Sequence, residues 1–575
     1  MKTIKGIGAS EGIAIAPAFR YLPELPPIER HKVDQINVET QRLASAIAKV
    51  DSDLMELKTQ LEEEIGHEEA AIFEAHRMIL SDKAFVGRAH EIISNDQINA
   101  EAAVNSVMHE FRQTFEAMED EYFRERAMDV VDVGQRLLRA IMDLPQPSLA
   151  ELPHPCIVLA NDLTPSDTAR MDRKNVRGFC TARGGKTAHA AILARSLGIP
   201  AVVGASAEIL DIPQDHILIL DGQIGTVIVE PDEATLSEYE YRRTLLSELR
   251  VKAMATAHEP AVSLDGRQVE IVANIGTVEE AEQVLECGGE GVGLLRTEFL
   301  FIDRTTPPDE DAQTNAYRTI AEVLGERPLI IRTLDIGGDK PLPYLPLHKE
   351  ENPFLGQRGI RLCLAMPDMF KIQLRAILRA ADGYDIKIMF PMVAHIDELR
   401  AAKVLLQQAR AELDARNVPY GEPDIGIMIE IPAAALTADI LAKEVDFFSI
   451  GTNDLTQYTL AADRTNALVQ DIADALHPAV LRLIDKTIRH AHEAGIWVGL
   501  CGELAGDPVA TPVLLGLELD EFSMAPNSIP FVKQVIRCWS VEEARQLANE
   551  ILLLDSEAQV RERVEKFQNT KEKDG

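Results

Sequence analysis

The run from Gly184 to His189 has the residue types and spacing needed to form and hold a phosphorylated histidine. Gly184 and Gly185 let the backbone turn tightly, and Thr187 stands where it could cap the helix predicted for the apolar run 190–197. His189 then falls in the first helical turn, where free backbone N–H groups and the helix dipole favour an anion. The alternative is a glycine turn followed by an incidental surface histidine, because so short a motif also arises by chance.

A second set of reactive side chains lies in the C-terminal half, where several of them follow short apolar segments. The set contains Arg296, Arg332, Arg358, Glu430, Asn453, Asp454, Arg464 and Cys501. The four arginines supply forked donors that suit a multiply charged phosphate or carboxylate. Arg296 and Arg332 end apolar segments, where an unpaired buried charge would be costly, and this favours a bound anion over a structural role.

The carboxylates and the cysteine of this set each have two interpretations. Glu430 and Asp454 are hard oxygen ligands at neighbouring strand ends and suit Mg²⁺, which completes its shell with waters and substrate phosphate. The alternative is a salt bridge to one of the arginines. Cys501 ends an apolar segment, where a cysteine is usually inert packing, although over a bound substrate it could donate a proton to an enolate.

The elements that must position this second set repeat a strand and helix rhythm after Val262. Eight short apolar strands are predicted: 269–273, 291–295, 329–332, 386–390, 425–430, 447–450, 497–500 and 521–524. Eight such units in this length are typical of a (β/α)₈ barrel, whose functional residues gather at the C-terminal ends of the strands.

The N-terminal half predicts a different organisation. Residues 7–17 indicate a loop followed by a short strand, and residues 34–142 indicate a helical bundle, with helices at 34–64, 68–80 and 83–94 and a long run at 101–142. Strands at 156–160, 176–180, 201–204, 216–221 and 226–229 then complete a compact α/β domain that carries His189. Residues 234–257 predict a connecting helix, and we expect hinges near Pro231 and Pro260.

Composition narrows the class of protein. A chain of 575 residues forms several domains. No apolar run approaches the length that spans a bilayer, and the N-terminus lacks a secretory pattern. Six scattered cysteines without a C-x-x-C pair argue against a disulfide framework or zinc site and for a reducing cytoplasm. The net charge of -35 argues against nucleic acid as a partner and favours a partner with a basic face.

Several long segments together resemble enzyme I of the bacterial sugar phosphotransferase system, the family of phosphoenolpyruvate-protein phosphotransferases. The likeness runs from Gly8-Ala9-Ser10 to the last predicted strand. The segments that carry it are 162–166, 184–189, 289–299, 332–340, 351–356, 446–458 and 501–506.

The resemblance implies a role for each residue and each domain. His189 would be the phosphorylated histidine and Cys501 the proton donor that converts enolpyruvate to pyruvate; the substrate phosphoenolpyruvate would be bound by Arg296, Arg332, Arg358, Asn453, Asp454 and Arg464, and Mg²⁺ by Glu430 and Asp454. The implied domains are a swivelling phosphohistidine α/β domain (1–22 and 145–230), an inserted helical domain that binds the carrier protein HPr (23–144), a linker helix (231–261) and a phosphoenolpyruvate-binding barrel (262–575). The family is typically a cytoplasmic homodimer paired through this barrel.

Departures from the family pattern are few. Glu11, Lys186 and Ala188 replace residues common in the family, and 471–477 lacks an expected Tyr-x-Pro, which puts the geometry of that loop in doubt. Pyruvate phosphate dikinase and phosphoenolpyruvate synthase are the nearest alternatives, but they need an ATP-binding domain for which this chain has only the helical segment. The nitrogen-linked enzyme I would add an N-terminal sensory domain, and an acidic scaffold protein would leave the strand-end arginines unexplained.

Overall fold

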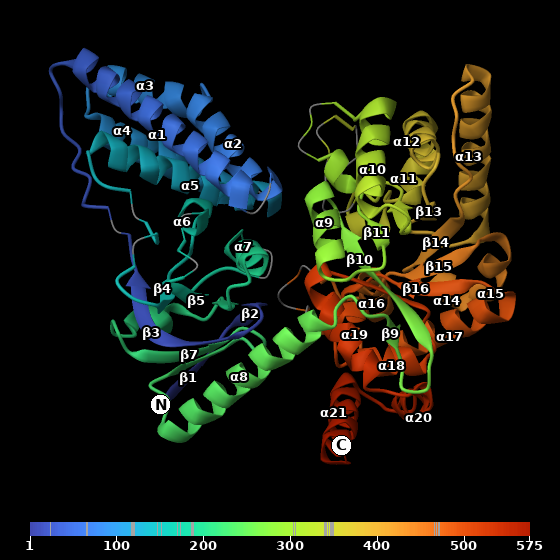
Figure 1. Cartoon of the computed structure of the whole chain (residues 1–575). Helices are drawn as coiled ribbons and strands as arrows, with labels where there is room; N and C mark the ends of the chain where they lie inside the picture. The colour runs from blue at the N-terminus through green and yellow to red at the C-terminus, as the bar shows by residue number, and fades with distance from the viewer. Residues whose placement is uncertain are drawn as a thin grey trace. The chain divides into compact units, whose positions relative to one another are not determined.

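The structure is a computed structural model, and the chain divides into two units, Met1–Ser247 and Glu248–Gly575. It describes all residues except 24, 65–66, 117–120, 147, 151, 170, 173, 186–188, 303, 305, 338–341, 343, 346–349, 465, 467–468, 470–471 and 575. Figure 1 labels the elements of both units, and each unit is described by itself below.

A helical bundle forms one part of the first unit. Its helices are α1 (Ile36–Glu64), α2 (His67–Ser81), α3 (Phe85–Asp96), α4 (Ala100–Glu116) and α5 (Glu121–Ile141). The apolar stripe of α1 is buried in the bundle at Leu43, Val50 and Leu54, as its three-to-four residue spacing predicts. The single helical run predicted for 101–142 is two helices, α4 and α5, and the residues between them lie outside the described part of the chain.

An eight-stranded sheet forms the other part of the first unit, with the order β1-β8-β7-β3-β4-β5-β6-β2. Its strands are β1 (Lys2–Lys5), β2 (Ile7–Ser10), β3 (Ile13–Tyr21), β4 (Cys156–Ala160), β5 (Val176–Thr181), β6 (Ala201–Val203), β7 (Ile217–Asp221) and β8 (Thr226–Val229). β3 and β4 pair in parallel although the whole bundle separates them in sequence. The bundle is therefore an insertion between two neighbouring strands of this sheet, as predicted.

The prediction of a loop at the start of the chain was wrong. Residues Ile7–Ser10 form β2, which pairs antiparallel with β6, and β1 before it pairs with β8. Both partner strands lie about two hundred residues away in sequence, so a local sequence pattern cannot predict the hydrogen bonds that make these segments strands.

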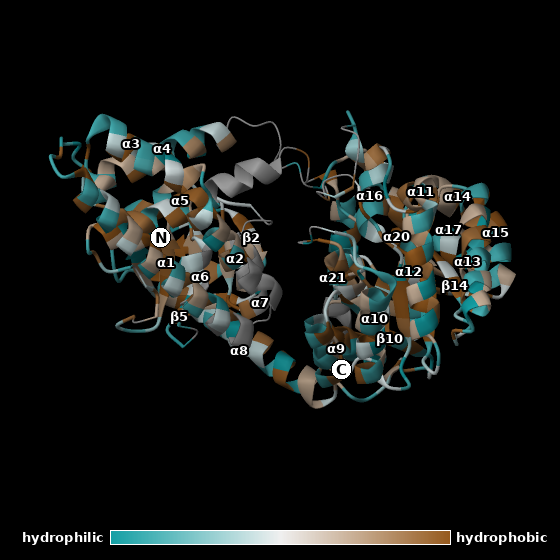
Figure 2. Cartoon of the chain, turned by 90° about the horizontal axis from the view of Figure 1, so that it is seen from above, coloured by the Kyte–Doolittle hydropathy of each residue, from teal (hydrophilic) through white to brown (hydrophobic). Residues whose placement is uncertain are grey.

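Helix α8 (Glu233–Ala255) follows the sheet. Near its start Tyr239 is buried, and Arg242 pairs with Asp221 of β7 at 3.2 Å. Its middle is exposed and carries hydrophobic as well as hydrophilic residues, among them Tyr241 at 69% and Val251 at 68% exposure (Figure 2).

The second unit is built on eight parallel strands that close into a barrel. They are β10 (Gln268–Ile275), β11 (Val292–Leu295), β12 (Leu329–Arg332), β13 (Ile386–Phe390), β14 (Ile425–Ile429), β15 (Phe447–Ile450), β16 (Trp497–Leu500) and β17 (Glu521–Met524). Closure comes from the pairing of β10 with both β17 and β11. The predicted (β/α)₈ barrel is confirmed, and β9 (Ala261–Val262) adds a short antiparallel strand to β10.

Helices cover the outside of the barrel, and a smaller cluster fills its inside. The helices of this unit are α9 (Val278–Glu286), α10 (Glu310–Leu324), α11 (Ile360–Ala365), α12 (Pro367–Ala380), α13 (Ile396–Arg416), α14 (Pro432–Leu436), α15 (Ala438–Leu441), α16 (Thr452–Leu460), α17 (Pro478–Ala494), α18 (Thr511–Gly516), α19 (Ile529–Arg537), α20 (Val541–Ile551) and α21 (Glu557–Asp574). Leu294, Ile330, Met389, Met428 and Phe447 form a separate buried cluster together with Cys501. A packed interior leaves the strand ends as the place for chemistry.

The structure also bears on membrane-spanning helices and on the state of the cysteines. Within the described ranges, no helix is both long enough and apolar enough to cross a membrane. The six cysteines are free thiols, and all except Cys538 are buried.

Candidate functional site

The residues predicted for chemistry in the second unit come from the C-terminal ends of the barrel strands and the segments that follow them. Arg332 is the last residue of β12, whereas Arg296, Glu430 and Cys501 directly follow β11, β14 and β16. Asn453 and Asp454 lie in the first turn of α16, which follows β15. Parallel strands of a closed barrel all end at the same rim, so the fold brings these side chains to one end.

Arg332 is buried against two carboxylates. Its Nη2 donates to Oε1 of Glu298 at 2.8 Å, and its Nη1 lies 3.2 Å from Oδ2 of Asp335. Burial acts to lower the pKa of the guanidinium, but the charges of Glu298 and Asp335 outweigh it and hold the pKa above its ordinary value. Arg332 therefore stays positively charged at the rim.

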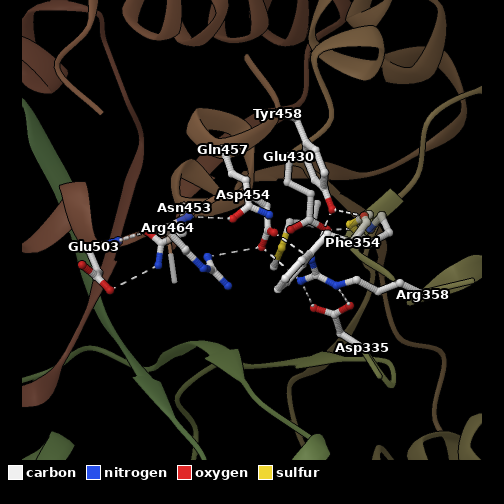
Figure 3. Close-up of polar contacts among 12 residues, drawn as sticks. Asp335, Phe354, Arg358, Glu430, Asn453, Asp454, Gln457, Tyr458, Arg464 and Glu503 are labelled. Carbon is white, nitrogen blue, oxygen red and sulfur yellow. Dashed lines mark hydrogen bonds and ion pairs between the residues drawn. The ribbon is translucent and has the colours of Figure 1, made fainter. Parts of the chain in front are cut away.

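Arg358 lies between two carboxylates and engages both with paired hydrogen bonds (Figure 3). Nε and Nη2 donate to Asp335, each at 3.0 Å, and Nη1 and Nη2 donate to Asp454 at 2.7 and 3.1 Å. Nη1 also donates to the Tyr458 hydroxyl at 3.3 Å, and the residue is only 6% exposed. In this arrangement Arg358 orients Asp454, and the salt bridge considered as the alternative for Asp454 is present.

Glu430 is a buried carboxylate with two other carboxylates, Asp454 and Asp335, and two arginines, Arg358 and Arg332, nearby. It is 1% exposed, and Oε1 accepts a hydrogen bond from the Met392 backbone N–H at 2.6 Å. Burial, followed by the nearby charges of Asp454 and Asp335, raises the pKa of Glu430 to about 8. Met392 adopts a positive φ of 58°, an uncommon conformation for a non-glycine residue that aims its N–H at this carboxylate.

The donor set fits a hard divalent cation. Glu430 and Asp454 offer carboxylate oxygens, and a cation beside them would oppose both the burial and the repulsion that raise the pKa of Glu430. The described residues hold no cluster of three or more histidine, cysteine or acidic side chains able to bind a metal. Two carboxylates agree with the way Mg²⁺ is commonly held, because water and substrate phosphate supply the remaining ligands.

Cys501 carries its proton at neutral pH. The side chain is buried, Sγ lies 3.7 Å from the backbone oxygen of Ile450, and burial raises the pKa of the thiol to about 11. The carbonyl of Cys501 accepts a hydrogen bond from Asn274 Nδ2 at 2.9 Å, which ties the residue to β10. A protonated thiol can donate a proton but is a poor nucleophile.

The remaining predicted binding residues are less enclosed. Arg296 is exposed, and Arg464 is 39% exposed in its side chain, with Nη1 3.6 Å from Oδ2 of Asp454. Asn453 is linked to Glu503, whose N–H donates to Oδ1 of Asn453 at 3.0 Å (Figure 3). Arg296 is therefore exposed and Arg464 is partly exposed beside Asp454, whereas Arg332 and Arg358 are buried against carboxylates.

His189 lies in the other unit, where it is the first residue of α7 (His189–Leu197). Gly184 adopts a positive φ of 100°, which agrees with the predicted glycine turn. The side chain of His189 and the predicted cap Thr187 lie outside the described residues. The backbone alone places His189 in the first turn, among N–H groups that have no partner within the helix.

Sequence reasoning missed several residues that hold this site together. Glu298 and Asp335 bind the arginines, and Tyr458 and Glu503 support Arg358 and Asn453. The signal available was proximity, because Glu298 and Asp335 follow Arg296 and Arg332 by two and three residues. Neither could be assigned, since an exposed acidic residue and one buried against arginine look alike in sequence.

Known proteins similar to this chain include enzymes that use phosphoenolpyruvate (PEP). A family model described as the PEP-binding domain of PEP-utilising enzymes matches residues 250–541, and models for the N-terminal and mobile domains of these enzymes match 5–126 and 152–225. Relatives named phosphoenolpyruvate-protein phosphotransferase include one from Priestia megaterium, 47% identical over 97% of this chain and 98% of its own. Another, from Bacillus subtilis, is 45% identical over 97% and 98%. A solution structure titled as an enzyme I protein is 37% identical over 42% of this chain and 99% of its own, with a TM-score of 0.37.

Proposed function

Because the chain belongs to the enzyme I family of phosphoenolpyruvate-protein phosphotransferases, we propose that it transfers the phosphoryl group of phosphoenolpyruvate first to His189 and then to the histidine of the carrier protein HPr, releasing pyruvate. This is the first step of the sugar phosphotransferase system. The observation that carries the proposal is the rim of the barrel, where arginines, two hard carboxylates and a protonated thiol lie together.

The side chains of the rim divide the work of phosphoryl transfer. Arg296, Arg464 and Arg332 neutralise the phosphate and carboxylate of the substrate, and Asn453 adds an amide, because this transfer depends mainly on positioning and charge stabilisation. His189 attacks in line, and the bond to the enol oxygen breaks. Cys501 then supplies the proton that converts enolpyruvate to pyruvate, which requires the thiol form that its raised pKa maintains.

Glu430 and Asp454 would hold Mg²⁺ at this rim. When bound, the cation neutralises phosphoryl charge and orients the substrate. Arg358 contributes to this site by fixing both oxygens of Asp454. Direct binding of the substrate by Arg358 stays a prediction, because Arg358 would first have to break its hydrogen bonds to Asp335.

The domains would serve two transfers by one histidine. In this proposal the phosphohistidine domain comprises 1–22 and 145–230, the helical domain 23–144 binds HPr, the linker is 231–261, and the barrel 262–575 binds substrate and pairs two copies of the chain. Since His189 must meet both the rim and the carrier, we expect the phosphohistidine domain to swivel.

Intact mass measurement tests the proposed reaction. The chain is mixed with phosphoenolpyruvate and Mg²⁺ beside a His189→Ala variant, and we expect one acid-labile phosphoryl group on the wild type and none on the variant. Adding HPr should remove it. A gain from ATP and not from phosphoenolpyruvate would instead indicate the dikinase class, and no gain from either would refute the proposal.

A further inference from the structure

Two buried atoms beside Arg332 lack hydrogen-bond partners among the described residues. They are Nε of Arg332 and Oε2 of Glu298. Glu298 is 1% exposed and Arg332 is 8% exposed, so bulk water does not hydrate the carboxylate or the Arg332 Nε. An unsatisfied buried donor or acceptor is destabilising, and two facing partners that each lack one bond call for an explanation.

The two unpartnered atoms belong to a hydrogen-bonded fork that is half formed. Nη2 of Arg332 already donates to Oε1 of Glu298 at 2.8 Å. Nε and Nη2 are neighbouring donors on one edge of the guanidinium, and the two oxygens of a carboxylate match that edge. Closing the fork would pair Nε with Oε2 and satisfy both atoms, but in this structure the third nitrogen, Nη1, faces Asp335 at 3.2 Å.

The backbone around this fork is held rigidly. Glu298 opens the short 3₁₀ helix η2 (Glu298–Leu300), and its Oε1 also accepts the Asp335 N–H at 3.0 Å. Thr297 donates its hydroxyl to the Arg332 carbonyl at 2.9 Å and accepts a bond from Gln373 at 3.2 Å. The β11 and β12 ends are thus tied together, which leaves the carboxylate and guanidinium as the parts able to turn.

We propose that Glu298 is the positioning residue for Arg332, and that the fork closes when Nη1 leaves Asp335 for the phosphate or carboxylate of the substrate. The number of contacts that Arg332 makes with the carboxylates of this chain stays the same, because the Nη1 contact to Asp335 is lost as the Nε contact to Oε2 of Glu298 forms. This inference rests on the proposed function, since it assigns the substrate as the anion that Arg332 receives.

The size of the effect follows from the need for accurate placement. A misplacement of about 1 Å in a catalytic group can lower the rate about 100-fold. Gln at position 298 can still accept one bond from Nη2 through its carbonyl, but its amide N–H₂ cannot accept a bond from Nε. We therefore expect Glu298→Gln to lower kcat/KM for phosphoenolpyruvate about 10- to 100-fold.

The test is a double-mutant cycle on phosphoryl uptake from phosphoenolpyruvate. Glu298→Gln, Arg332→Lys and the double variant are compared, and in the Arg332→Lys background, where the fork is already lost, we expect Glu298→Gln to cost less than threefold. Glu310→Gln is the matched control, because the largely buried Glu310 carboxylate also bonds arginines, Arg375 and Arg379, and belongs to no part of the proposed site. It should leave kcat/KM within twofold.

The outcomes separate this inference from the proposed function. If the wild type takes up no phosphoryl group, the proposed function fails. If it does, and Glu298→Gln lowers kcat/KM less than twofold or by the same factor in both backgrounds, the positioning role is refuted. Should Glu298→Gln fail to fold, the cycle is run with Glu298→Asp, which keeps the charge but shortens the reach, and the same coupling with Arg332 is required.

Discussion

Replacing Arg358 by Met should strongly destabilise the barrel. Arg358 is 6% exposed, and its guanidinium makes four hydrogen bonds to two carboxylates, Asp335 and Asp454. Met has a similar length and fills the space, but it leaves two buried carboxylates beside Glu430 without their shared cation. Burial and like charge would then act together against the folded state.

The magnitude follows from the cost of breaking a buried ion pair on one side. Removing one partner typically costs about 3–5 kcal/mol, and we expect Arg358→Met to fall in that range at neutral pH. Arg358→Lys keeps the charge but cannot form two parallel pairs of bonds, so its loss should be smaller, at about 1–3 kcal/mol.

Tryptophan fluorescence during guanidinium chloride unfolding is a suitable assay. Both tryptophans, Trp497 and Trp539, lie in the barrel unit, so their signal reports on that unit alone. Arg545→Met is a matched control, because Arg545 also bridges two carboxylates, Glu518 and Glu542, but is half exposed. Exposed pairs contribute about 0–1 kcal/mol, so the control should unfold close to the wild type.

Arg358→Met would cost no more than the loss of an exposed ion pair only if the two carboxylates did not need Arg358. If the variant lowers the free energy of unfolding by less than about 1 kcal/mol, then the negative charge of Asp335 and Asp454 does not depend on Arg358 for neutralisation. The account of Arg358 as the residue that orients Asp454 would then be wrong.

Three further predictions concern a proton donor, a pH-dependent pair and the linker. Cys501→Ala should still exchange phosphoryl groups but should release pyruvate slowly, and normal pyruvate release by this variant would show that Cys501 is not the proton donor. In the wild type, loss of the thiol proton should not slow pyruvate release until the pH approaches about 11. The hydrogen bond to Asp520 raises the pKa of His492, so the stabilisation from this pair is full below the unfolded histidine pKa of about 6.5 and is lost as the pH rises through the folded pKa. The denaturant midpoint should therefore fall as the pH rises above about 6.5, and His492→Gln should remove that part of the fall. Lys533 is buried and donates to the carbonyls of Ala257 and Gly288 at 3.1 and 2.7 Å, so it ties the segment after α8 to the barrel. Lys533→Met should therefore speed hydrogen exchange of the backbone amides of 253–259, and unchanged exchange would show that Lys533 does not restrain this segment beside the hinge expected near Pro260.

Local patterns were sufficient for most of the architecture. The strand at 329–332, like those at 386–390 and 447–450, was predicted with the bounds that the structure has, because short apolar runs between helices are a local property. The two N-terminal strands were missed, because their partners are remote in sequence. The division of 101–142 into α4 and α5 was also missed, since no glycine or proline marks it and Gly134 lies within α5.

The chemical groups of this protein are evident from its amino-acid sequence, and the repeat of strands and helices predicts that a barrel brings most of them to one rim. The contacts that each group makes there depend on the folded structure. It buried Glu298 and Asp335 against arginines, engaged Arg358 with two carboxylates and raised the pKa values of Glu430 and Cys501. Burial and charge proximity depend on residues far apart in the chain, and these two quantities set whether a side chain is a ligand, a proton donor or a support.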